Sequence, residues 1–368
     1  MQKPIYFDYA ATTPVHSAVL NDMLPYFSEE FGNAGSNQHY YGWVAEEAIQ
    51  KSRAQIAQYF KLPSSSIVFT SGATESNNLA IQGFLSGKKT GHIITSSLEH
   101  KAVLAVCQQM QSLGWAVTYL TPNANGLIEV EDIKAAIQPN TVLISLMLVN
   151  NELGTILDYE AVRSLADINQ ITFHSDATQA IGKIDLQGKQ LPHLLSISGH
   201  KVYGPKGIGA LIVQNGVKIH PIVFGGDQER GIRSGTLAVQ QIIGLASSFK
   251  LIPELLIHAQ KLAQFKSRIA QAVPKHWKLN AKHEATVPHI LSISLPETDW
   301  ETLFQRIPAV ALSNGSACNA KTHLPSHVLK AIGLSDAEAL ATLRISMGLG
   351  TTSDDVNFLI SYLTEKLV

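Results

Sequence analysis

Short runs of β-branched and aliphatic residues alternate with longer stretches of helical periodicity along most of this chain. The expected strands are residues 67–70, 92–96, 116–119, 142–148, 172–174, 194–198 and 209–213. The expected helices between them are residues 76–85, 101–113, 130–137 and 159–169. Strands that alternate with helices are typical of parallel crossovers, and several runs are apolar on both faces, as a sheet covered on both sides requires. The pattern predicts an α/β fold around a mainly parallel sheet.

The pattern changes in the last third of the chain. A long helical stretch, residues 239–272, follows a glycine-rich segment. Beyond it, expected strands at residues 290–294, 310–312 and 342–346 alternate with helices. We therefore expect a large domain over residues 1–252 and a smaller α+β domain over residues 253–368.

The composition narrows the function classes. Of 368 residues, 45% are hydrophobic and 15% charged, which is a globular balance. The net charge is −1, so no basic field is present that would bind nucleic acid by counterion release. The N-terminus lacks a signal-peptide core, and the longest apolar run, residues 142–149, is too short to cross a bilayer. Cys107 and Cys318 form no disulfide framework, so we expect a cytoplasmic protein. From its charge and its apolar runs we expect it to bind neither nucleic acid nor membrane.

Polar residues follow the expected strands at their carboxyl ends, where ligands bind in open α/β sheets. Taken singly, such residues are more often helix caps or satisfied polar groups. Five strand ends in succession that carry them are hard to explain in that way. The residues are, in chain order, the segment 71–77, Glu99 and His100, Asn150 to Glu152, Asp176 and Gln179, and Ser198 to Lys201.

These residue types suit pyridoxal 5′-phosphate (PLP). A PLP enzyme needs a lysine that bonds to the cofactor, a carboxylate for the pyridinium nitrogen and donors for the phosphate. Lys201, Asp176 and the small residues 71–74 supply these types. Taken alone, residues 71–74 are weak evidence for a phosphate site, because many such turns only cap a helix. A solvated surface lysine is the alternative for Lys201, but the glycines within residues 203–209 indicate a tight turn around a site.

Two residues near the C-terminus carry further chemistry. Cys318 lies among small polar residues, which predicts an exposed loop where a thiol can be reached and can ionise. The alternative, a small buried hydrophobe, is what we expect of Cys107 in its apolar helix. Arg344 offers a planar fork that can bind a carboxylate bidentately, the alternative being a structural arginine on a strand.

Over nearly its whole length the chain resembles the NifS/IscS-like cysteine desulfurases of the class V aminotransferase superfamily. The lysine motif at residues 198–209 and the cysteine motif at residues 315–318 are the most specific. The other matching segments are residues 6–14, 69–78, 150–155, 174–180, 225–236 and 343–346.

The resemblance implies a homodimer with the PLP fold-type-I architecture, a seven-stranded sheet and no metal. It also implies that the first residues of the chain, about 12, pack with the smaller domain. It implies that Lys201 bonds to PLP, that His100 stacks on the ring, and that Asp176 and Gln179 bind the ring nitrogen and hydroxyl. Asn151 and Arg344 would orient the substrate, Asn151 also lying at the cofactor. The residues implied for the phosphate are Ala73, Thr74, Ser198 and His200, with Thr236 reaching the site of the neighbouring subunit.

The expected reaction removes sulfur from L-cysteine, giving L-alanine and a persulfide on Cys318, with Lys201 and His100 moving protons. A selenocysteine lyase or another class V enzyme is the alternative, although a plain aminotransferase needs no thiol. A non-enzymatic regulator on an inactive scaffold is disfavoured, because every expected catalytic residue is present. The sequence does not name the sulfur acceptor: iron–sulfur cluster assembly, tRNA thiolation and DNA sulfur modification all stay open.

Overall fold

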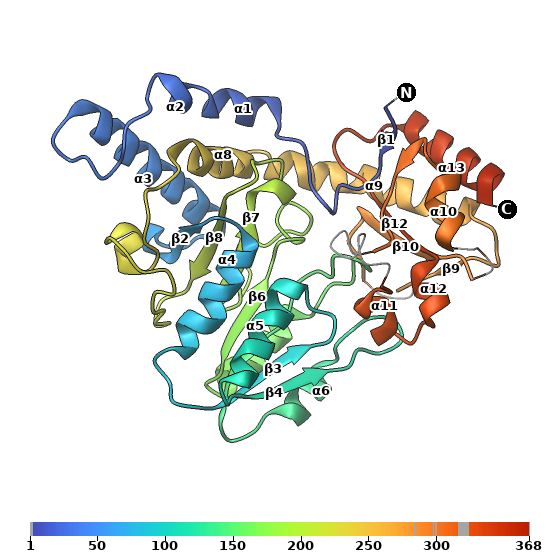
Figure 1. Cartoon of the computed structure of the whole chain (residues 1–368), viewed down its shortest axis with the longest axis horizontal. Helices are drawn as coiled ribbons and strands as arrows, with labels where there is room; N and C mark the ends of the chain where they lie inside the picture. The colour runs from blue at the N-terminus through green and yellow to red at the C-terminus, as the bar shows by residue number, and fades with distance from the viewer. Residues whose placement is uncertain (1–2, 283–284, 297, 299, 316–323, 368) are drawn as a thin grey trace.

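The molecule consists of a large part around a central sheet and a smaller part on which both chain ends lie (Figure 1). The computed structural model describes residues 3–282, 285–296, 298, 300–315 and 324–367. Helix α9 (Ile252–Ala272) runs from the large part along the smaller one. Residue Cys318 falls outside the described residues.

The central sheet confirms the predicted α/β class. Its strands, in spatial order, are β2 (Ile67–Thr70), β8 (Gly209–Val213), β7 (Leu194–Ser198), β6 (Thr172–Asp176), β5 (Thr141–Ser145), β3 (His92–Ser96) and β4 (Ala116–Leu120). Neighbours from β7 to β4 are parallel, and β8 is antiparallel to both β2 and β7. All strands except β8 therefore end at the same edge of the sheet, where the polar residues of the sequence follow them.

Apolar residues on both faces of the sheet explain why helices cover it on both sides. Adjacent residues such as Ile93 and Ile94 point into different apolar clusters, as the period of two requires. One cluster includes residues of α3 (Tyr40–Phe60), α7 (Tyr159–Ile168) and α8 (Val239–Phe249). The opposite clusters include residues of α5 (Lys101–Ser112) and of a π-helical segment (Leu79–Gly83) that continues α4 (Ala73–Asn78).

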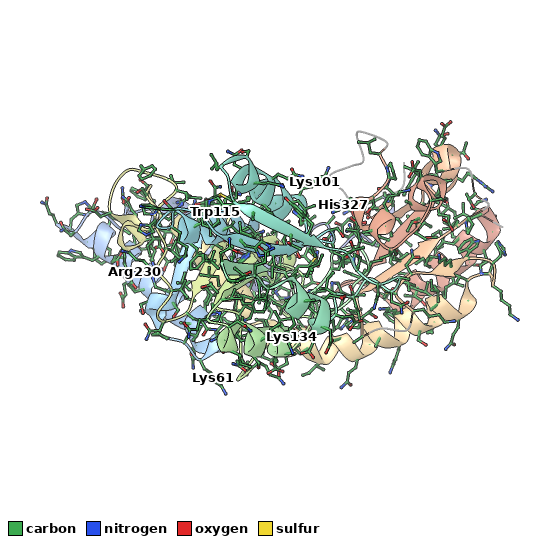
Figure 2. The ribbon with its side chains drawn as sticks, turned by 90° about the horizontal axis from the view of Figure 1, so that it is seen from below. Lys61, Lys101, Trp115, Lys134, Arg230 and His327 are labelled. Carbon is green, nitrogen blue, oxygen red and sulfur yellow. The ribbon has the colours of Figure 1, made fainter. Side chains whose placement is uncertain are left out.

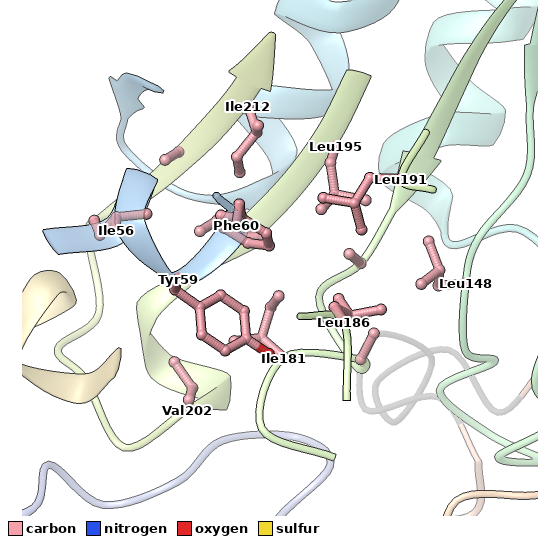
Figure 3. Packing of buried hydrophobic residues seen from close by; sticks show 14 of the residues in the cluster. Ile56, Tyr59, Phe60, Leu148, Ile181, Leu186, Leu191, Leu195, Val202 and Ile212 are labelled. Carbon is pink, nitrogen blue, oxygen red and sulfur yellow. The ribbon is translucent and has the colours of Figure 1, made fainter. Parts of the chain in front are cut away.

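The largest cluster shows how a helix end is fixed to the sheet (Figure 3). Tyr59 and Phe60, at the end of α3, lie beside Ile181 on one side and the sheet residues Leu195 and Ile212 on the other. Burying a side chain of this size contributes about 1.5–3 kcal/mol. The packing therefore holds α3 rigidly behind the sheet.

The structure corrects several element predictions. Helix α3 was not predicted, because its buried face carries small and polar residues such as Gly42, Ser52 and Arg53 rather than an apolar stripe. The stretch 239–272 is two helices, α8 and α9, bent by 55° where Pro253 enters the first turn of α9. Strand β5 ends at Ser145 instead of residue 148.

The smaller part has its own sheet and core. Strands β12 (Thr342–Ser346), β10 (Ile290–Ser294) and β9 (Lys278–Leu279) are antiparallel. Their apolar cluster includes residues of α9, α10 (Trp300–Arg306) and α13 (Ser353–Leu367), together with Phe7 from the start of the chain. Next to Phe7, β1 (Ile5–Tyr6) pairs with β11 (Val310–Ala311). The N-terminal segment therefore lies against the smaller part.

The remaining helices lie at the periphery. Helices α1 (Ser17–Met23) and α2 (Pro25–Ser28) run along α8, and α6 (Val130–Ala136) lies beside β4. In the smaller part, α11 (His327–Ala331) and α12 (Asp336–Leu340) face the large part. Within the described ranges no single helix is long and apolar enough to cross a membrane; only α8 and α9 taken together reach that length and hydropathy, and α8 is mostly buried in the core.

Candidate active site

A cavity of 430 Å³ lies at the edge of the central sheet where its strands end. Segments that follow β2, β3, β6 and β7 line it, together with residues from the N-terminal segment and one residue of β12. The volume lies in the range of sites for cofactors and small molecules. The sheet topology thus brings residues from both parts of the chain to one site.

Asp176 is a buried carboxylate at the end of β6 that faces this cavity. The side-chain amide of Asn77 donates to its Oδ2 at 2.7 Å, and the backbone N–H of Thr178 donates to its Oδ1 at 2.9 Å. These two donors fix the orientation of the carboxylate. An ionised carboxylate only accepts hydrogen bonds, so it suits a protonated nitrogen of a bound molecule.

Lys201 follows β7 at the end of one turn of 3₁₀ helix (Gly199–Lys201). Its Nζ donates to the backbone oxygens of Ala10 and Ala11, at 2.7 Å each. Tyr203 stabilises the turn: it has a left-handed backbone with φ of 63°, its N–H donates to Thr13, and its hydroxyl accepts from the N–H of Leu349. The amine is therefore held inside the cavity by the N-terminal segment.

His100 supplies a neutral imidazole to the cavity. It caps α5, and its Nδ1 accepts a hydrogen bond from the N–H of Ala102 at 3.1 Å, which places the proton of the neutral ring on Nε2. Burial lowers its pKa, and Lys201 lowers it further, although Asp176 acts in the opposite direction. A neutral ring with a free face suits stacking on an aromatic ligand.

A group of small residues also lines the cavity. Gly72 precedes α4 with a φ of 149°, which favours glycine, and no side chain caps the helix there. Ala73 and Thr74 begin the helix, and Ser198 lies close to Gly72. Backbone N–H groups at a helix start together with hydroxyl groups make a site for an anion.

His200 lies beside this group of small residues. Burial, together with the charges of Lys201 and Lys206, lowers the pKa of its imidazole to about 4. Its Nδ1 lies 3.1 Å from the hydroxyl of Thr12. His200 is therefore neutral at pH 7 and contributes hydrogen bonds rather than charge.

Arg344, on β12, presents a guanidinium to the cavity from the smaller part. Its Nη1 donates to the backbone oxygen of Asn151 at 2.9 Å, and its Nη2 pairs with Asp8 at 2.8 Å. Its Nε is buried and has no hydrogen-bond partner among the described residues. Nη1 and Nη2 each use one of their two hydrogens in these bonds, so the guanidinium is fixed in place and keeps N–H donors for a ligand carboxylate.

The structure places ten of the twelve site residues named from the sequence around this one cavity. They are Ala73, Thr74, His100, Asn151, Asp176, Gln179, Ser198, His200, Lys201 and Arg344. Thr236 lies elsewhere, exposed beside a separate 410 Å³ pocket that Arg53 and Asp227 also line. Cys318 lies outside the described residues, so its place in the site stays a prediction.

Sequence reasoning missed the residues that hold the site in shape. Asn77 orients Asp176, and Asp8 pairs with Arg344. Glu75 accepts from the N–H of Ser71 at 2.8 Å and pairs with Arg233 at 2.7 Å. Asp8, Glu75 and Asn77 all lie in segments whose resemblance was noted, but nothing in the sequence assigns their partners.

Comparisons with known proteins agree with this geometry. The model of the aminotransferase class-V family matches residues 5–359. Cysteine desulfurase IscS of Methylococcus capsulatus is 42% identical over 375 residues, which cover 100% of this chain and 93% of that protein. Cysteine desulfurase IscS of Neisseria meningitidis is 43% identical over 377 residues, with the same shares.

Two solved structures extend the likeness to the fold. A NifS-like protein superposes with a TM-score of 0.91 at 32% identity, covering 99% of both chains. SspA, solved in complex with cysteine, superposes with a TM-score of 0.84 at 41% identity, covering 94% of this chain and 99% of that one. The chain therefore belongs to the aminotransferase class-V family and, within it, to the cysteine desulfurases.

Proposed function

We propose that this protein is a PLP-dependent cysteine desulfurase, which moves the sulfur of L-cysteine onto Cys318 and releases L-alanine. The observation that carries the proposal is the cavity that holds Lys201, Asp176 and Arg344 together. A lysine, a buried carboxylate and a fixed arginine are the groups that cofactor attachment, ring binding and substrate binding require.

The cavity residues fit PLP. Asp176 suits the pyridinium nitrogen, because its carboxylate is oriented by Asn77 and lies inside the cavity. Gln179 lies beside it, its amide tied to the backbone oxygen of Ala10 at 2.8 Å, and suits the ring hydroxyl together with Asn151. His100 suits the ring face. The group of Ala73, Thr74, Ser198 and His200 suits the phosphate, and Lys201 suits the aldehyde carbon.

When bound, PLP supplies an electron-poor ring that accepts the electron pair of a broken bond at the substrate Cα. The protein must then move protons at defined atoms. We assign the removal of the Cα proton to Nζ of Lys201 and the donation of a proton to Nε2 of His100, which carries the proton of its neutral imidazole; both residues line the cavity. Arg344 binds the substrate carboxylate, and Asn151 lies beside it, so that Cα faces Lys201.

Sulfur transfer requires a nucleophile. The thiolate of Cys318 attacks the substrate sulfur, an S–S bond forms while the C–S bond breaks, and the carbon skeleton leaves as L-alanine after gaining a proton. The enzyme keeps a persulfide for an acceptor. The motif Gly315 to Cys318 supports this assignment, and a thiol in that motif is what distinguishes a desulfurase from a plain aminotransferase.

We also propose that two copies of the chain associate. Thr236 does not line the cavity of its own chain, and it lies in the segment that, by resemblance, completes the phosphate site of the neighbouring subunit. Large apolar side chains are exposed on the single chain, among them Phe27, Phe31, Trp43 and Phe224. Light scattering should find an active dimer, and an active monomer would contradict this.

The division into residues 1–252 and 253–368 and the cytoplasmic location are likewise proposals. An apolar cluster made of residues of the second part together with Phe7 supports the division, although Val287 and Ile290 of that part pack in the cluster of the first. Cys107 is free and buried, and the sequence has no CxxC pair; both observations support a reducing compartment.

The proposal is tested with the holoenzyme. Incubation with L-cysteine should release L-alanine and add one sulfur to the peptide that contains Cys318, as read by mass spectrometry. Lys201→Ala should lose the visible absorption of bound PLP after dialysis. Selenocysteine serves as the comparison substrate: alanine release from it alone would make the protein a selenocysteine lyase, and release from neither would refute the proposal.

A further inference from the structure

The turn that follows β5 contacts two separate features of the smaller part. Asn150 holds the turn, since its Oδ1 accepts from the N–H groups of Glu152 and Leu153 at 2.9 and 2.8 Å. The backbone oxygen of Asn151 accepts from Arg344. The next side chain, Glu152, points elsewhere and has no part in the mechanism above.

Glu152 touches both flanks of the segment that contains Cys318. Its Oε2 accepts a hydrogen bond of 2.5 Å from the hydroxyl of Ser326, the N-cap of α11. On the other flank, Gly315 approaches so closely that a Cβ at that position would lie 2.5 Å from the same Oε2. Gly315 also has a φ of 107°, which favours glycine. One carboxylate oxygen thus meets residues 315 and 326.

Glu152 is a costly residue to place here. It is only 2% exposed, and burial raises its pKa, while Ser326, Arg344, His327 and Lys101 lower it. Lys101 of α5 and His327 of α11 lie near each other where the two parts of the molecule meet (Figure 2). Burying a carboxyl group costs stability unless the group is hydrogen-bonded, and the hydroxyl of Ser326 supplies such a bond to Glu152.

The same region is tied to the substrate arginine. The backbone N–H of Arg344 donates to the oxygen of Ser313 at 2.7 Å, two residues before Gly315. His327, next to Ser326, approaches the backbone oxygen of Glu99 at 2.9 Å, beside His100. The turn Asn151-Glu152 therefore contacts Arg344 through one residue and the flanks Gly315 and Ser326 through the next.

We infer that Glu152 is a positioning residue for sulfur transfer, which fixes Gly315 and Ser326 relative to Arg344. This inference rests on the proposed function. Arg344 holds the substrate and Cys318 takes its sulfur, so the two must be brought to a defined separation. A misplacement of about 1 Å between reacting groups can cost about a hundredfold in rate.

Two variants separate the reach of the side chain from its carboxyl group. Glu152→Asp keeps the carboxyl group but is one methylene shorter, so it cannot touch both Gly315 and Ser326. Glu152→Gln keeps the length and still offers an oxygen to the Ser326 hydroxyl. Glu338→Ala is the matched control: it removes the capping box of α12 in the same part of the molecule, where Glu338 bonds to Ser335, and it lowers stability without changing a contact of Glu152 with Gly315 or Ser326.

The experiment uses each PLP-loaded protein and two readouts. The first is the dissociation constant for L-cysteine, from the change in cofactor absorption. The second is the single-turnover rate at which the Cys318 peptide gains sulfur. We expect Glu152→Asp to bind cysteine within about twofold of the wild type and to transfer sulfur roughly ten- to a hundredfold more slowly. Glu152→Gln should stay within about threefold on both readouts, as should Glu338→Ala.

The alternative outcomes are distinct. Wild-type transfer by Glu152→Asp would overturn the inference. So would a loss of cysteine binding in both Glu152 variants that parallels the loss of transfer, because that would show a general structural role. Slow transfer in both variants with cysteine binding intact would support positioning by the carboxylate itself. A wild type that gains no sulfur would instead refute the proposed function, and this is established before the variants are compared.

Discussion

Asp8 and Arg344 stand 336 positions apart in the chain, yet the carboxylate of Asp8 lies 2.8 Å from Nη2 of Arg344. The side chain of Arg344 is 3% exposed and that of Asp8 18% exposed. The pair forms because the N-terminal segment crosses the smaller part, where Phe7 and Tyr9 bond to Ser346 on the same strand as Arg344. Asp8 therefore determines how the guanidinium faces the cavity.

Asp8→Asn tests this relationship. The amide keeps the shape of the side chain but removes the charge that orients Arg344, and a hydrogen bond to a charged group contributes about 1.5–3 kcal/mol. The KM for L-cysteine should rise about tenfold or more, with the absorption of bound PLP unchanged. Steady-state kinetics and a cofactor titration measure the two effects. An unchanged KM would show that Asn151 alone suffices to hold the arginine.

Arg344→Lys tests the role of the arginine itself. Lysine keeps the charge but loses the planar fork that binds a carboxylate through two donors. We expect PLP to stay bound and kcat/KM for L-cysteine to fall roughly ten- to a hundredfold, as the loss of a charged hydrogen bond would produce. Loss of PLP with unchanged affinity for cysteine would instead assign Arg344 to the cofactor.

The fold was largely predictable because its strands are short apolar runs bounded by polar residues. The bounds of β2, β3, β7 and β8 agree with the predicted ranges to the residue. Helix α3 was not predicted, because its buried face has no apolar stripe that periodicity could detect. Arg53, for example, lies in the core and is paired with Glu229. That pairing joins residues 176 positions apart, which periodicity does not reveal.

The candidate site was predictable only where the chemistry lies at strand ends. Lys201 and Asp176 follow strands that the sequence locates, so their meeting in one cavity could be expected. Asn77, Asp8 and Glu152 act through partners on distant segments, and their identities give no signal of those partners. A polar residue in a loop gives the same sequence pattern whether its side chain faces water or supports a site.

The buried carboxyl of Glu99 gives the protein a pH-dependent stability. Burial raises its pKa from 4.5 to about 8. Between these values the folded protein holds a proton that the unfolded chain releases, so this group lowers the free energy of unfolding as the pH rises from about 5 to 8. Glu99→Gln is neutral at every pH and lacks this term. The variant should therefore gain thermal stability relative to the wild type as the pH rises.

Midpoints of thermal unfolding at pH 5, 6, 7 and 8 measure the difference between the two proteins. The raised pKa of Glu152 affects both proteins equally, so it cancels in the difference. Glu338→Gln is a suitable control, because capping by Ser335 lowers the pKa of Glu338 and its contribution is constant above pH 5. A constant difference between Glu99→Gln and the wild type across this range would contradict the buried, protonated state of Glu99.

The two cysteines should differ completely in chemistry. Cys107 lies on α5 in an apolar cluster with Val103, Met110 and Trp115, and burial raises the pKa of its thiol to about 12. At pH 7 it is therefore protonated, and the thiolate is the form that attacks sulfur. Cys107 has neither the ionisation nor the access that a sulfur acceptor needs.

Cys318→Ala should bind PLP and L-cysteine but form no persulfide, because the nucleophile is missing while Lys201, Asp176 and Arg344 are intact. Cys107→Ala should keep full turnover and lose about 1 kcal/mol of stability from packing. Mass spectrometry after incubation with L-cysteine should place the added sulfur on the Cys318 peptide, and iodoacetamide should label Cys318 before Cys107 in the resting protein. Sulfur found on Cys107 would contradict the mechanism, because the core around α5 would have to open during turnover. A Cys318→Ala enzyme that still passes sulfur to an acceptor would show that the mechanism needs no persulfide on Cys318.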